Sequence, residues 1–212
     1  MAVAGGCGRQ DETASSPSTH CVAPNTASPP QVLVVDDEEG VADVLALRIQ
    51  DRYDTRVADG GREALSAVDD EVDAVLLDRR MPDIHGDDVL AEIRDRGHDC
   101  VVVMTTAVDP DLNILEMDFD DYLSKPIERE TLLETLDRHL NSQEAGDPRL
   151  EEFFSTVSKI EVLEEEVGAA QLADSEEYAE LKDRAGELGR ELDESHADFE
   201  ELVETFHEIT RE

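Results

Sequence analysis

Short apolar runs alternate with amphipathic stretches between Gln31 and Leu140, and this alternation predicts strands and helices in turn. The predicted strands are Gln31–Val35, Tyr53–Ala58, Ala74–Leu77, Cys100–Thr105 and Tyr122–Ser124. The first, third and fourth are almost wholly apolar, as strands buried on both faces of a parallel sheet are. The predicted helices are Gly40–Arg52, Arg62–Asp69, Asp87–Arg96, Pro110–Met117 and Glu128–Leu140. Five such units in about 110 residues predict an α/β fold with a doubly wound, five-stranded parallel sheet.

A second helical region follows a predicted linker at residues 141–147. Leu150, Phe153, Val157 and Ile160 recur at spacings of three and four residues and begin one helix. A longer helix follows, with a strict alternation of the same two spacings that only Ser195 interrupts; its apolar positions are Tyr178, Leu181, Ala185, Leu188, Leu192, Phe199, Leu202, Phe206 and Ile209. This pattern is a coiled-coil seam. It predicts an all-α antiparallel hairpin over residues 148–212, or a hairpin whose long helix pairs with a second chain.

Two of the predicted helices start with capping signals. Asp109 precedes Pro110, and proline at the first helical position after a capping residue is typical of a helix N-terminus. Asp174 lies three residues before Glu177, which makes it a candidate cap where the hairpin turns back.

The N-terminal residues 1–30 are rich in Ala, Ser, Thr, Pro and Gly and show no hydrophobic periodicity. This composition predicts a disordered tail. An alternative that the sequence leaves open is that the start codon has been placed too early. The predicted organisation is therefore a tail at 1–30, an α/β domain at 31–140, a linker at 141–147 and a helical hairpin at 148–212.

The chain is strongly acidic, with 55 acidic and 18 basic side chains and a formal net charge of -37. Such a charge repels nucleic-acid backbones and anionic lipid surfaces, so we expect neither as a direct partner. Residues 148–212 alone hold 21 acidic and 6 basic side chains, which also disfavours a DNA-binding output. Acidic residues spread along the whole chain are typical of a protein that stays hydrated in concentrated salt, and they indicate a halophilic archaeon.

The sequence contains no run of about 18 apolar residues and therefore predicts no membrane span. Residues 1–10 lack the features of a signal peptide. We therefore expect a cytoplasmic protein. The three cysteines, Cys7, Cys21 and Cys100, have no metal-binding spacing and do not predict a disulfide framework. Cys100 is expected in the core as a small apolar residue.

Residues suited to phosphoryl chemistry follow four of the predicted strands. Asp36 and Asp37 follow the first strand, Asp78 ends the third, Thr106 ends the fourth and Lys125 follows the fifth. A parallel sheet gathers these ends at one edge, where ligands bind in such folds. Carboxylates that close together need a cation, and Mg²⁺ prefers oxygen ligands and leaves a position for a phosphoryl oxygen. Asp78 can then act as a nucleophile, while the metal and Lys125 balance the charge of the transferred group.

Taken one by one, these residues are also compatible with ordinary structural roles. An acidic pair in so acidic a chain is usually a solvated surface, and Thr106 and Tyr122 could be a strand-end hydroxyl and a core aromatic residue. Lys125 is more informative, because the whole chain has three lysines and one of them follows the last strand. The joint spacing over about 110 residues is what makes the pattern specific.

That joint spacing closely resembles the response-regulator receiver domain. The matching residues are Asp36-Asp37, Asp78, Met81-Pro82 with Gly86, Thr106-Ala107, and Tyr122 three residues before Lys125-Pro126. The resemblance implies a flavodoxin-like fold with Asp78 as the phosphoacceptor. It implies Asp37 as a direct metal ligand, Asp36 as an acid that contacts the metal through water, and the backbone carbonyl of Arg80 as a further ligand.

The same resemblance implies a switch formed by Thr106 and Tyr122. On phosphorylation the Thr106 hydroxyl would move to a phosphoryl oxygen, and Tyr122 would turn inward to fill the space. The resemblance also implies a cis Lys125-Pro126 bond. The expected phosphodonor is a sensor histidine kinase, and the chain itself would catalyse only its own phosphorylation and dephosphorylation.

One stretch departs from the receiver pattern. Receivers often have small residues before the last strand, whereas this chain has Met117-Asp118-Phe119-Asp120-Asp121, so the shape of the fourth helix and the following turn is in question. Together with the acidic hairpin, this feature resembles the haloarchaeal receiver proteins that carry a HalX domain. The expected partners are therefore the kinase, a protein that docks on the hairpin, and a second copy of the chain.

Two other functions are less compatible with the sequence. A phosphatase of the haloacid-dehalogenase type needs a second acid two residues after its aspartyl nucleophile, and this chain has Arg80 there. A flavin-binding protein of the same fold needs a hydroxyl-rich phosphate loop, and the acidic run from Asp36 to Glu39 would repel the cofactor phosphate. His139, His196 and His207 are scattered and are expected on the surface.

Overall fold

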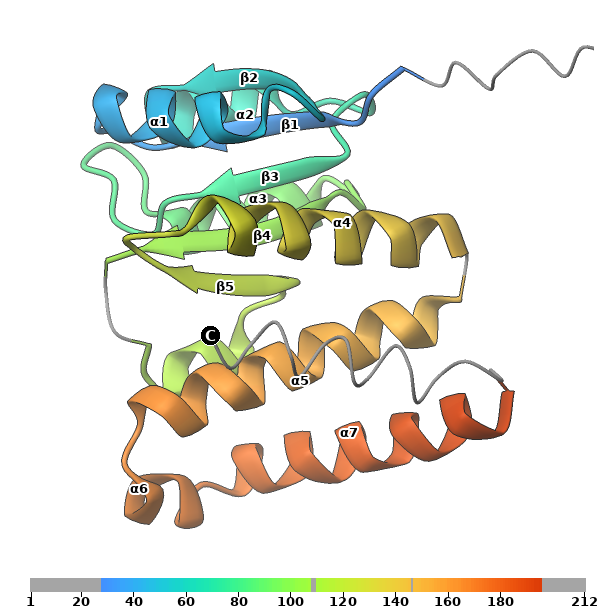
Figure 1. Cartoon of the computed structure of the whole chain (residues 1–212). Coiled ribbons are helices and arrows are strands. Elements are labelled where there is room, and N and C mark those ends of the chain that lie inside the picture. The colour runs from blue at the N-terminus through green and yellow to red at the C-terminus, as the bar shows by residue number, and fades with distance from the viewer. Residues whose placement is uncertain (1–27, 108–109, 146, 196–212) are drawn as a thin grey trace, which may run out of the picture.

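The computed structural model describes residues 28–107, 110–145 and 147–195. Its centre is a five-stranded, all-parallel sheet with the strand order β2-β1-β3-β4-β5 (Figure 1). The strands are β1 Gln31–Val35, β2 Asp54–Ala58, β3 Ala74–Leu77, β4 Val101–Thr106 and β5 Asp121–Ser124. The three central strands β1, β3 and β4 are the ones with near-continuous apolar sequence, since both of their faces are covered. The predicted α/β fold class and the parallel sheet are confirmed.

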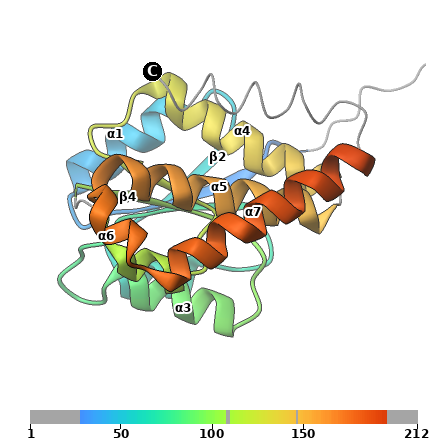
Figure 2. The same cartoon turned by 90° about the horizontal axis from the view of Figure 1, so that it is seen from below.

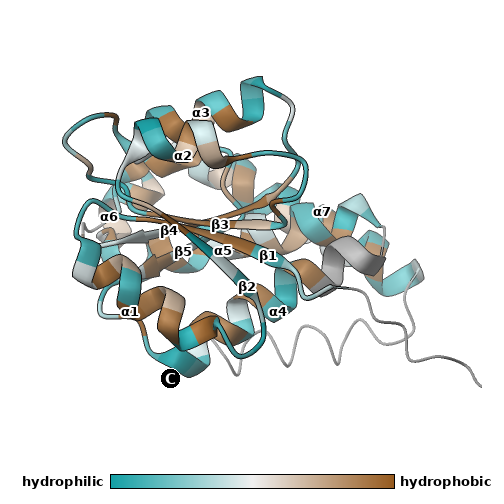
Figure 3. Cartoon of the chain, turned by 90° about the horizontal axis from the view of Figure 1, so that it is seen from above, coloured by the Kyte–Doolittle hydropathy of each residue, from teal (hydrophilic) through white to brown (hydrophobic). Residues whose placement is uncertain are grey.

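Helices cover both faces of the sheet (Figure 3). On one face α1 Glu39–Ile49 and α4 Arg129–Ala145 bury Leu45, Ile49 and Leu136 against alternate residues of the strands. On the other face lie α2 Gly61–Ala67, α3 Gly86–Asp95 and the short 3-10 helix η1 Leu112–Glu116. Cys100 is 8 % exposed and belongs to the core of this second face, as predicted.

The fourth predicted helix, Pro110–Met117, is wrong in type and length. The structure has the 3-10 helix η1 instead, capped by Asp111, whose side chain accepts a hydrogen bond from Asn113 N at 3.0 Å. Phe119 is 1 % exposed, and to reach the core the chain leaves the helix at Met117 and runs extended into β5. The predicted cap Asp109 lies outside the described residues.

The predicted linker at 141–147 is largely helical. Helix α4 continues to Ala145, because nothing in residues 141–145 breaks a helix before Gly146. Helix α5 Pro148–Glu166 then begins directly after Asp147, whose side chain accepts from Arg149 N at 3.0 Å. Most of the predicted linker therefore belongs to α4, and α5 follows it within a few residues.

The C-terminal region forms a helical hairpin beside β5 (Figures 1 and 2). Helix α5 lies next to the edge strand, the short helix α6 Ala169–Ala173 makes the turn, and α7 Glu176–Ser195 runs back along α5. The hairpin core consists of Leu150, Phe153, Phe154, Leu188 and Leu192. Along the described part of the α7 seam, Tyr178, Leu188 and Leu192 are thus buried within the same chain, and Leu181 and Ala185 are half-buried. Its later positions, from Phe199 to Ile209, lie outside the described residues.

Ser175, not Asp174, supplies the side chain that caps α7. Its hydroxyl accepts a hydrogen bond from Tyr178 N at 3.1 Å, which is the geometry of a cap that satisfies a free backbone donor. The predicted tail at 1–30 falls almost wholly outside the described residues. Among the residues described, no helix has the length and apolar character needed to cross a bilayer.

Candidate functional site

The carboxyl ends of β1, β3, β4 and β5 meet at one edge of the sheet. The register pairs Val35 with Leu77, Leu77 with Met104, and Thr106 with Ser124. The residue after each paired position is therefore carried to the same edge. Asp36 follows β1, Asp78 follows β3, and Lys125 follows β5.

Lys125 joins the two buried carboxylates of this edge. Its Nζ donates to Asp36 Oδ2 at 2.5 Å and to Asp78 Oδ1 at 2.6 Å, and Asp36 and Asp78 are 1 % and 6 % exposed. Burial by itself would lower the pKa of the ammonium, but the hydrogen bonds to Asp36 and Asp78 outweigh it and raise the pKa. Lys125 therefore stays charged and holds both carboxylates in place.

The backbone around Lys125 sets its direction. Lys125 N donates to the carbonyl of Thr106 at 2.8 Å, which continues the pairing of β4 and β5 by one residue. The following Lys125-Pro126 bond is cis, as predicted. Thr106 is 1 % exposed, so its position beside the site is fixed by the sheet.

The loop after Asp78 folds back over the same edge. Arg80 N donates to Asp78 Oδ2 at 2.7 Å, and Gly86 N donates to the carbonyl of Arg79 at 2.9 Å. A Cβ on Gly86 would lie only 2.3 Å from the carbonyl oxygen of Asp78. The glycine of the predicted motif is thus required by a close approach of two backbone segments.

Asp37 is placed differently from the other two acids. It follows Asp36 and is exposed, whereas Asp36 accepts a hydrogen bond from Glu38 N at 3.0 Å and is buried. Within the described ranges, no three acidic, histidine or cysteine side chains are gathered as a ready-made metal cage. The structure therefore joins Asp36 and Asp78 through Lys125, and it leaves Asp37 exposed at the start of the following loop. The donor set still suits Mg²⁺, which takes one or two carboxylates, a carbonyl oxygen and waters.

Tyr122 lies in the core behind the site. It is 3 % exposed, and its ring centroid is 5.9 Å from that of Phe119. Arg79, the residue after Asp78, holds Asp87 through three hydrogen bonds of 2.9 to 3.3 Å. The hydrogen bonds to the Asp87 carboxylate raise the pKa of the Arg79 guanidinium, and the nearby Tyr122 hydroxyl has a smaller effect in the same direction. Arg79 therefore holds Asp87 of α3 beside the loop that follows Asp78.

The role of Arg79 was missed in the sequence. The signal that was available is an arginine directly after Asp78 with an acid eight residues later, but loop geometry decides whether such residues meet.

His139 was expected on the surface and is 2 % exposed. Its Nε2 contacts Asp121 Oδ2 at 2.9 Å. His139 is buried because the hairpin covers this side of α4. His196 and His207 lie outside the described residues.

Asp121 is a buried carboxylate at the start of β5. It accepts from Tyr122 N at 2.8 Å, from Ser158 of α5, and contacts His139 and Arg138 of α4. Burial alone would raise the pKa of Asp121, but the contacts with His139, Arg138 and Ser158 outweigh it, and the pKa lies below its ordinary value. Asp121 therefore links the sheet, the last helix of the α/β domain and the hairpin.

A parallel sheet of this strand order, with two buried carboxylates, a lysine and a threonine at one edge, defines the class of receiver domains. The family model of the response regulator receiver domain matches residues 32–137, and that of the HalX domain matches residues 142–209. The chain therefore belongs to the response regulators and consists of a receiver domain followed by a HalX domain.

Individual relatives agree with this assignment. A protein of Haloferax volcanii described as a transcriptional regulator is 44% identical over 156 residues, which are 72% of this chain and 26% of that protein. The transcriptional regulatory protein CpxR of Klebsiella pneumoniae is 36% identical over 134 residues, 57% of each chain. The matched part of the chain thus spans about a quarter of the length of the Haloferax protein and somewhat more than half of the length of CpxR. The receiver domain of a LuxO repressor protein from Vibrio parahaemolyticus has a TM-score of 0.52 and 28% identity, over 57% of this chain and 96% of that chain.

Proposed function

We propose that Asp78 accepts a phosphoryl group from a sensor histidine kinase, and that the phosphorylated receiver changes the protein contacts of the HalX domain. The observation that carries the proposal is the buried pair of Asp36 and Asp78, held by the single ammonium of Lys125 at the edge of the sheet. Transcriptional regulation is the output that the description of the Haloferax relative supports.

In the transfer, a carboxylate oxygen of Asp78 attacks the phosphorus and forms an acyl phosphate. The bond between the phosphorus and the kinase histidine breaks, and its electron pair stays on the imidazole nitrogen. Lys125 is placed to exchange one carboxylate contact for a phosphoryl oxygen, since its Nζ already touches Asp78. Thr106, at the end of β4, would donate its hydroxyl to another phosphoryl oxygen.

Magnesium is the cofactor that fits this chemistry. Asp37, Asp78 and the backbone carbonyl of Arg80 would hold it, with Asp36 acting through water, and the ion would neutralise oxygens of the transferred group. The hydrogen bond from Arg80 N to Asp78 supports this assignment, because it brings the backbone of Arg80 against the phosphoacceptor. The chain's only chemistry in this proposal is its own phosphorylation and dephosphorylation.

An apolar groove beside the site supports docking of the kinase there. It has a volume of about 360 Å³ and is lined by residues of α1 and of the loop after β5, namely Gly40, Val41, Val44, Leu45, Arg48, Lys125, Pro126 and Ile127. Val44 and Leu47 on α1 are 46% and 65% exposed, which is unusual in a chain that is otherwise covered with acids. A partner that brings a phosphohistidine to Asp78 can bury this surface.

The decisive test of the proposal is intact-mass measurement after incubation with a small phosphodonor and Mg²⁺. We expect one added phosphoryl group on the wild-type chain and none on Asp78→Asn. Asp73→Asn, an exposed acid before β3, is the control and should be labelled like the wild type. An adduct that persists in Asp78→Asn would disprove the assignment.

A further inference from the structure

The loop between Asp78 and α3 is tied to α2 by the side chain of Asp83. The Asp83 carboxylate accepts a hydrogen bond from Gly61 N at 3.1 Å and another from Arg62 N at 2.9 Å. Both amides belong to the first turn of α2, where backbone N–H groups have no acceptor inside the helix. Asp83 thus fastens the loop to a helix that is not its neighbour in the chain.

The start of α2 depends on a side chain from elsewhere. Its N-cap position is Gly60, which has no side chain that could accept the free amides. A Cβ at Gly60 would lie 3.0 Å from Asp83 Oδ1, and a Cβ at Gly61 would lie 2.8 Å from the carbonyl oxygen of Ile84. The two glycines therefore let the loop come close enough to α2 for Asp83 to supply the missing cap.

The hydrogen bonds to Asp83 favour its charged form. The pKa of the Asp83 carboxyl is lowered mainly by the hydrogen bond from Arg62 N. The backbone of Ile84 and of Gly61 acts in the same direction, and burial acts against them. Hydrogen bonds to a charged acceptor are about twice as strong as neutral ones. Asp83 itself is exposed, so its removal leaves no cavity in the core.

The same loop carries a backbone group of the proposed metal site. At its start, Arg80 N donates to Asp78 Oδ2 at 2.7 Å. At its end, Gly86 N donates to the carbonyl of Arg79 at 2.9 Å. These contacts close the loop on itself and on the phosphoacceptor, whereas Asp83 joins its middle to a separate element.

Packing alone leaves the direction of this backbone open. Met81 is 2 % exposed and anchors the loop in the core, but its side chain is unbranched and adaptable. The carbonyl of Arg80 therefore needs a second fixed point to keep its direction. Asp83, three residues further along the chain, provides that point.

We propose that Asp83 is a positioning residue for the Mg²⁺ site, which ties the loop to α2 and thereby holds the backbone carbonyl of Arg80 ready for the metal. The inference rests on the proposed function of Asp78. A loop without this tie adopts further conformations, and the metal then binds only the fraction of chains in which the carbonyl is in place. The dissociation constant for Mg²⁺ rises in inverse proportion to that fraction.

Titration of the full chain with Mg²⁺ alone tests the inference without any phosphoryl transfer. Asp83→Ala removes both acceptor oxygens and should raise the Mg²⁺ concentration for half-saturation about fivefold. Asp83→Asn keeps one side-chain oxygen and should raise it about twofold. The NMR shifts of the backbone amides of Arg79 and Arg80, recorded in multimolar KCl, report binding at this site and not at other acids on the surface.

Asp69→Ala is the matched control. Asp69 is also an exposed aspartate, and the hydrogen bond that it accepts from Glu71 N at 3.0 Å lowers its pKa as well. It lies before β3, whereas Asp78 follows that strand. The same substitution there should leave the affinity for Mg²⁺ unchanged.

Hydrogen exchange without metal provides a second measurement. In Asp83→Ala, the amide of Gly86 should exchange severalfold faster than in the wild type, because the loop that holds its acceptor is released. In Asp69→Ala, it should keep the wild-type rate. Wild-type Mg²⁺ affinity or wild-type Gly86 exchange in Asp83→Ala overturns the inference, and so does an equal loss of affinity in Asp69→Ala. A wild-type chain whose Arg79 and Arg80 amides do not respond to Mg²⁺ overturns the proposed metal site instead.

Discussion

Two buried carboxylates and one ammonium make up the centre of the site. Asp36 and Asp78 lie on different strands, and Lys125 contacts both within 2.6 Å. Electrostatic interactions are stronger in a buried site than in water. Lys125 already balances the two carboxylates, so the negative charge of an incoming phosphoryl group needs further positive charge. In the proposed site, the exposed Asp37 and the backbone carbonyl of Arg80 would supply that charge as ligands of Mg²⁺.

The first prediction at the scale of residues concerns Asp37. Asp37→Ala should raise the Mg²⁺ concentration needed for half-maximal labelling by a small phosphodonor about tenfold, because a direct carboxylate ligand is lost. Asp43→Ala, an exposed acid on α1, is the control and should leave the titration curve in place. Equal curves for the two variants would exclude Asp37 as a ligand.

A second prediction concerns Asp121 and pH. The pKa of Asp121 is lowered in the folded chain, so its stabilising contribution is present above its ordinary value of 3.8 and is lost as the pH falls through the lower folded value. Asp121→Asn should decrease the free energy of unfolding at neutral pH by about 3 kcal/mol, because it leaves the buried His139 and the half-buried Arg138 without their carboxylate partner. It should also make the loss of stability below about pH 4 less steep.

Denaturant unfolding in multimolar KCl between pH 3 and 7 measures both effects. Asp193→Asn, an exposed acid on α7, serves as the control and should change the free energy of unfolding by less than about 0.5 kcal/mol. If Asp121→Asn behaves like this control, the buried network around Asp121 does not stabilise the fold.

At the scale of elements, α1 carries the exposed apolar residues next to the site. Val44→Asp should decrease the rate of phosphotransfer from a sensor kinase that labels the wild-type chain by about tenfold, because one buried apolar contact is worth about 1.5 to 3 kcal/mol. Labelling by a small phosphodonor should stay unchanged, since Val44 does not touch Asp78.

The control for this prediction is Val57→Asp. Val57 is 38% exposed on β2, the outer strand at the other edge of the sheet. Equal loss of phosphotransfer in both variants would indicate a general effect of added charge and would remove the groove beside α1 as the docking site.

At the scale of the whole molecule, the hairpin and the receiver share their apolar surfaces. Leu163 of α5 and Val167, which directly follows this helix, belong to the same buried cluster as Ile114 and Tyr122 of the receiver. Leu188 and Leu192 of α7 are 0% exposed. These apolar surfaces are therefore occupied within one chain. A second chain could bind them only in exchange for the contacts inside the chain.

Self-association should consequently depend on phosphorylation. We expect the full chain to be monomeric at micromolar concentration and to form a dimer when beryllofluoride and Mg²⁺ are added, because the proposed change in the contacts of the HalX domain would uncover apolar side chains. Sedimentation velocity in multimolar KCl measures this, and high salt prevents repulsion between chains with a net charge of -37. A chain that is monomeric in both states would exclude the dimer and leave the hairpin as a docking surface for another protein.

The sequence by itself determined the sheet and the residues at its edge. Apolar runs of the central strands are a local property, and parallel strands must bring their carboxyl ends together, so Asp36, Asp78, Thr106 and Lys125 could be placed before any coordinates. The seam of α7 was equally visible, because the spacing of apolar residues on a helix does not depend on its partner.

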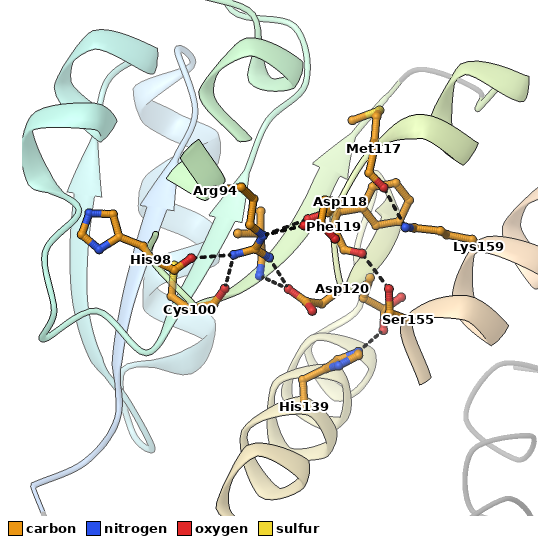
Figure 4. A network of polar contacts seen from close by, with 12 residues as sticks. Arg94, His98, Cys100, Met117, Asp118, Phe119, Asp120, His139, Ser155 and Lys159 are labelled. Carbon is orange, nitrogen blue, oxygen red and sulfur yellow. Dashed lines mark hydrogen bonds and ion pairs between the residues drawn. The ribbon is translucent and has the colours of Figure 1, made fainter. Parts of the chain in front are cut away.

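Only the tertiary structure decided what these elements contact. A 3-10 helix replaced the fourth helix because Phe119 has to reach the core, and His139 is buried because the hairpin covers α4. The contacts of Lys159 with the Met117 carbonyl and with the Phe119 ring (Figure 4) join residues that are far apart in the chain, and no local pattern encodes which of them meet. The sequence specified which faces are apolar, and the packing of α5 against the receiver specified which of them are covered.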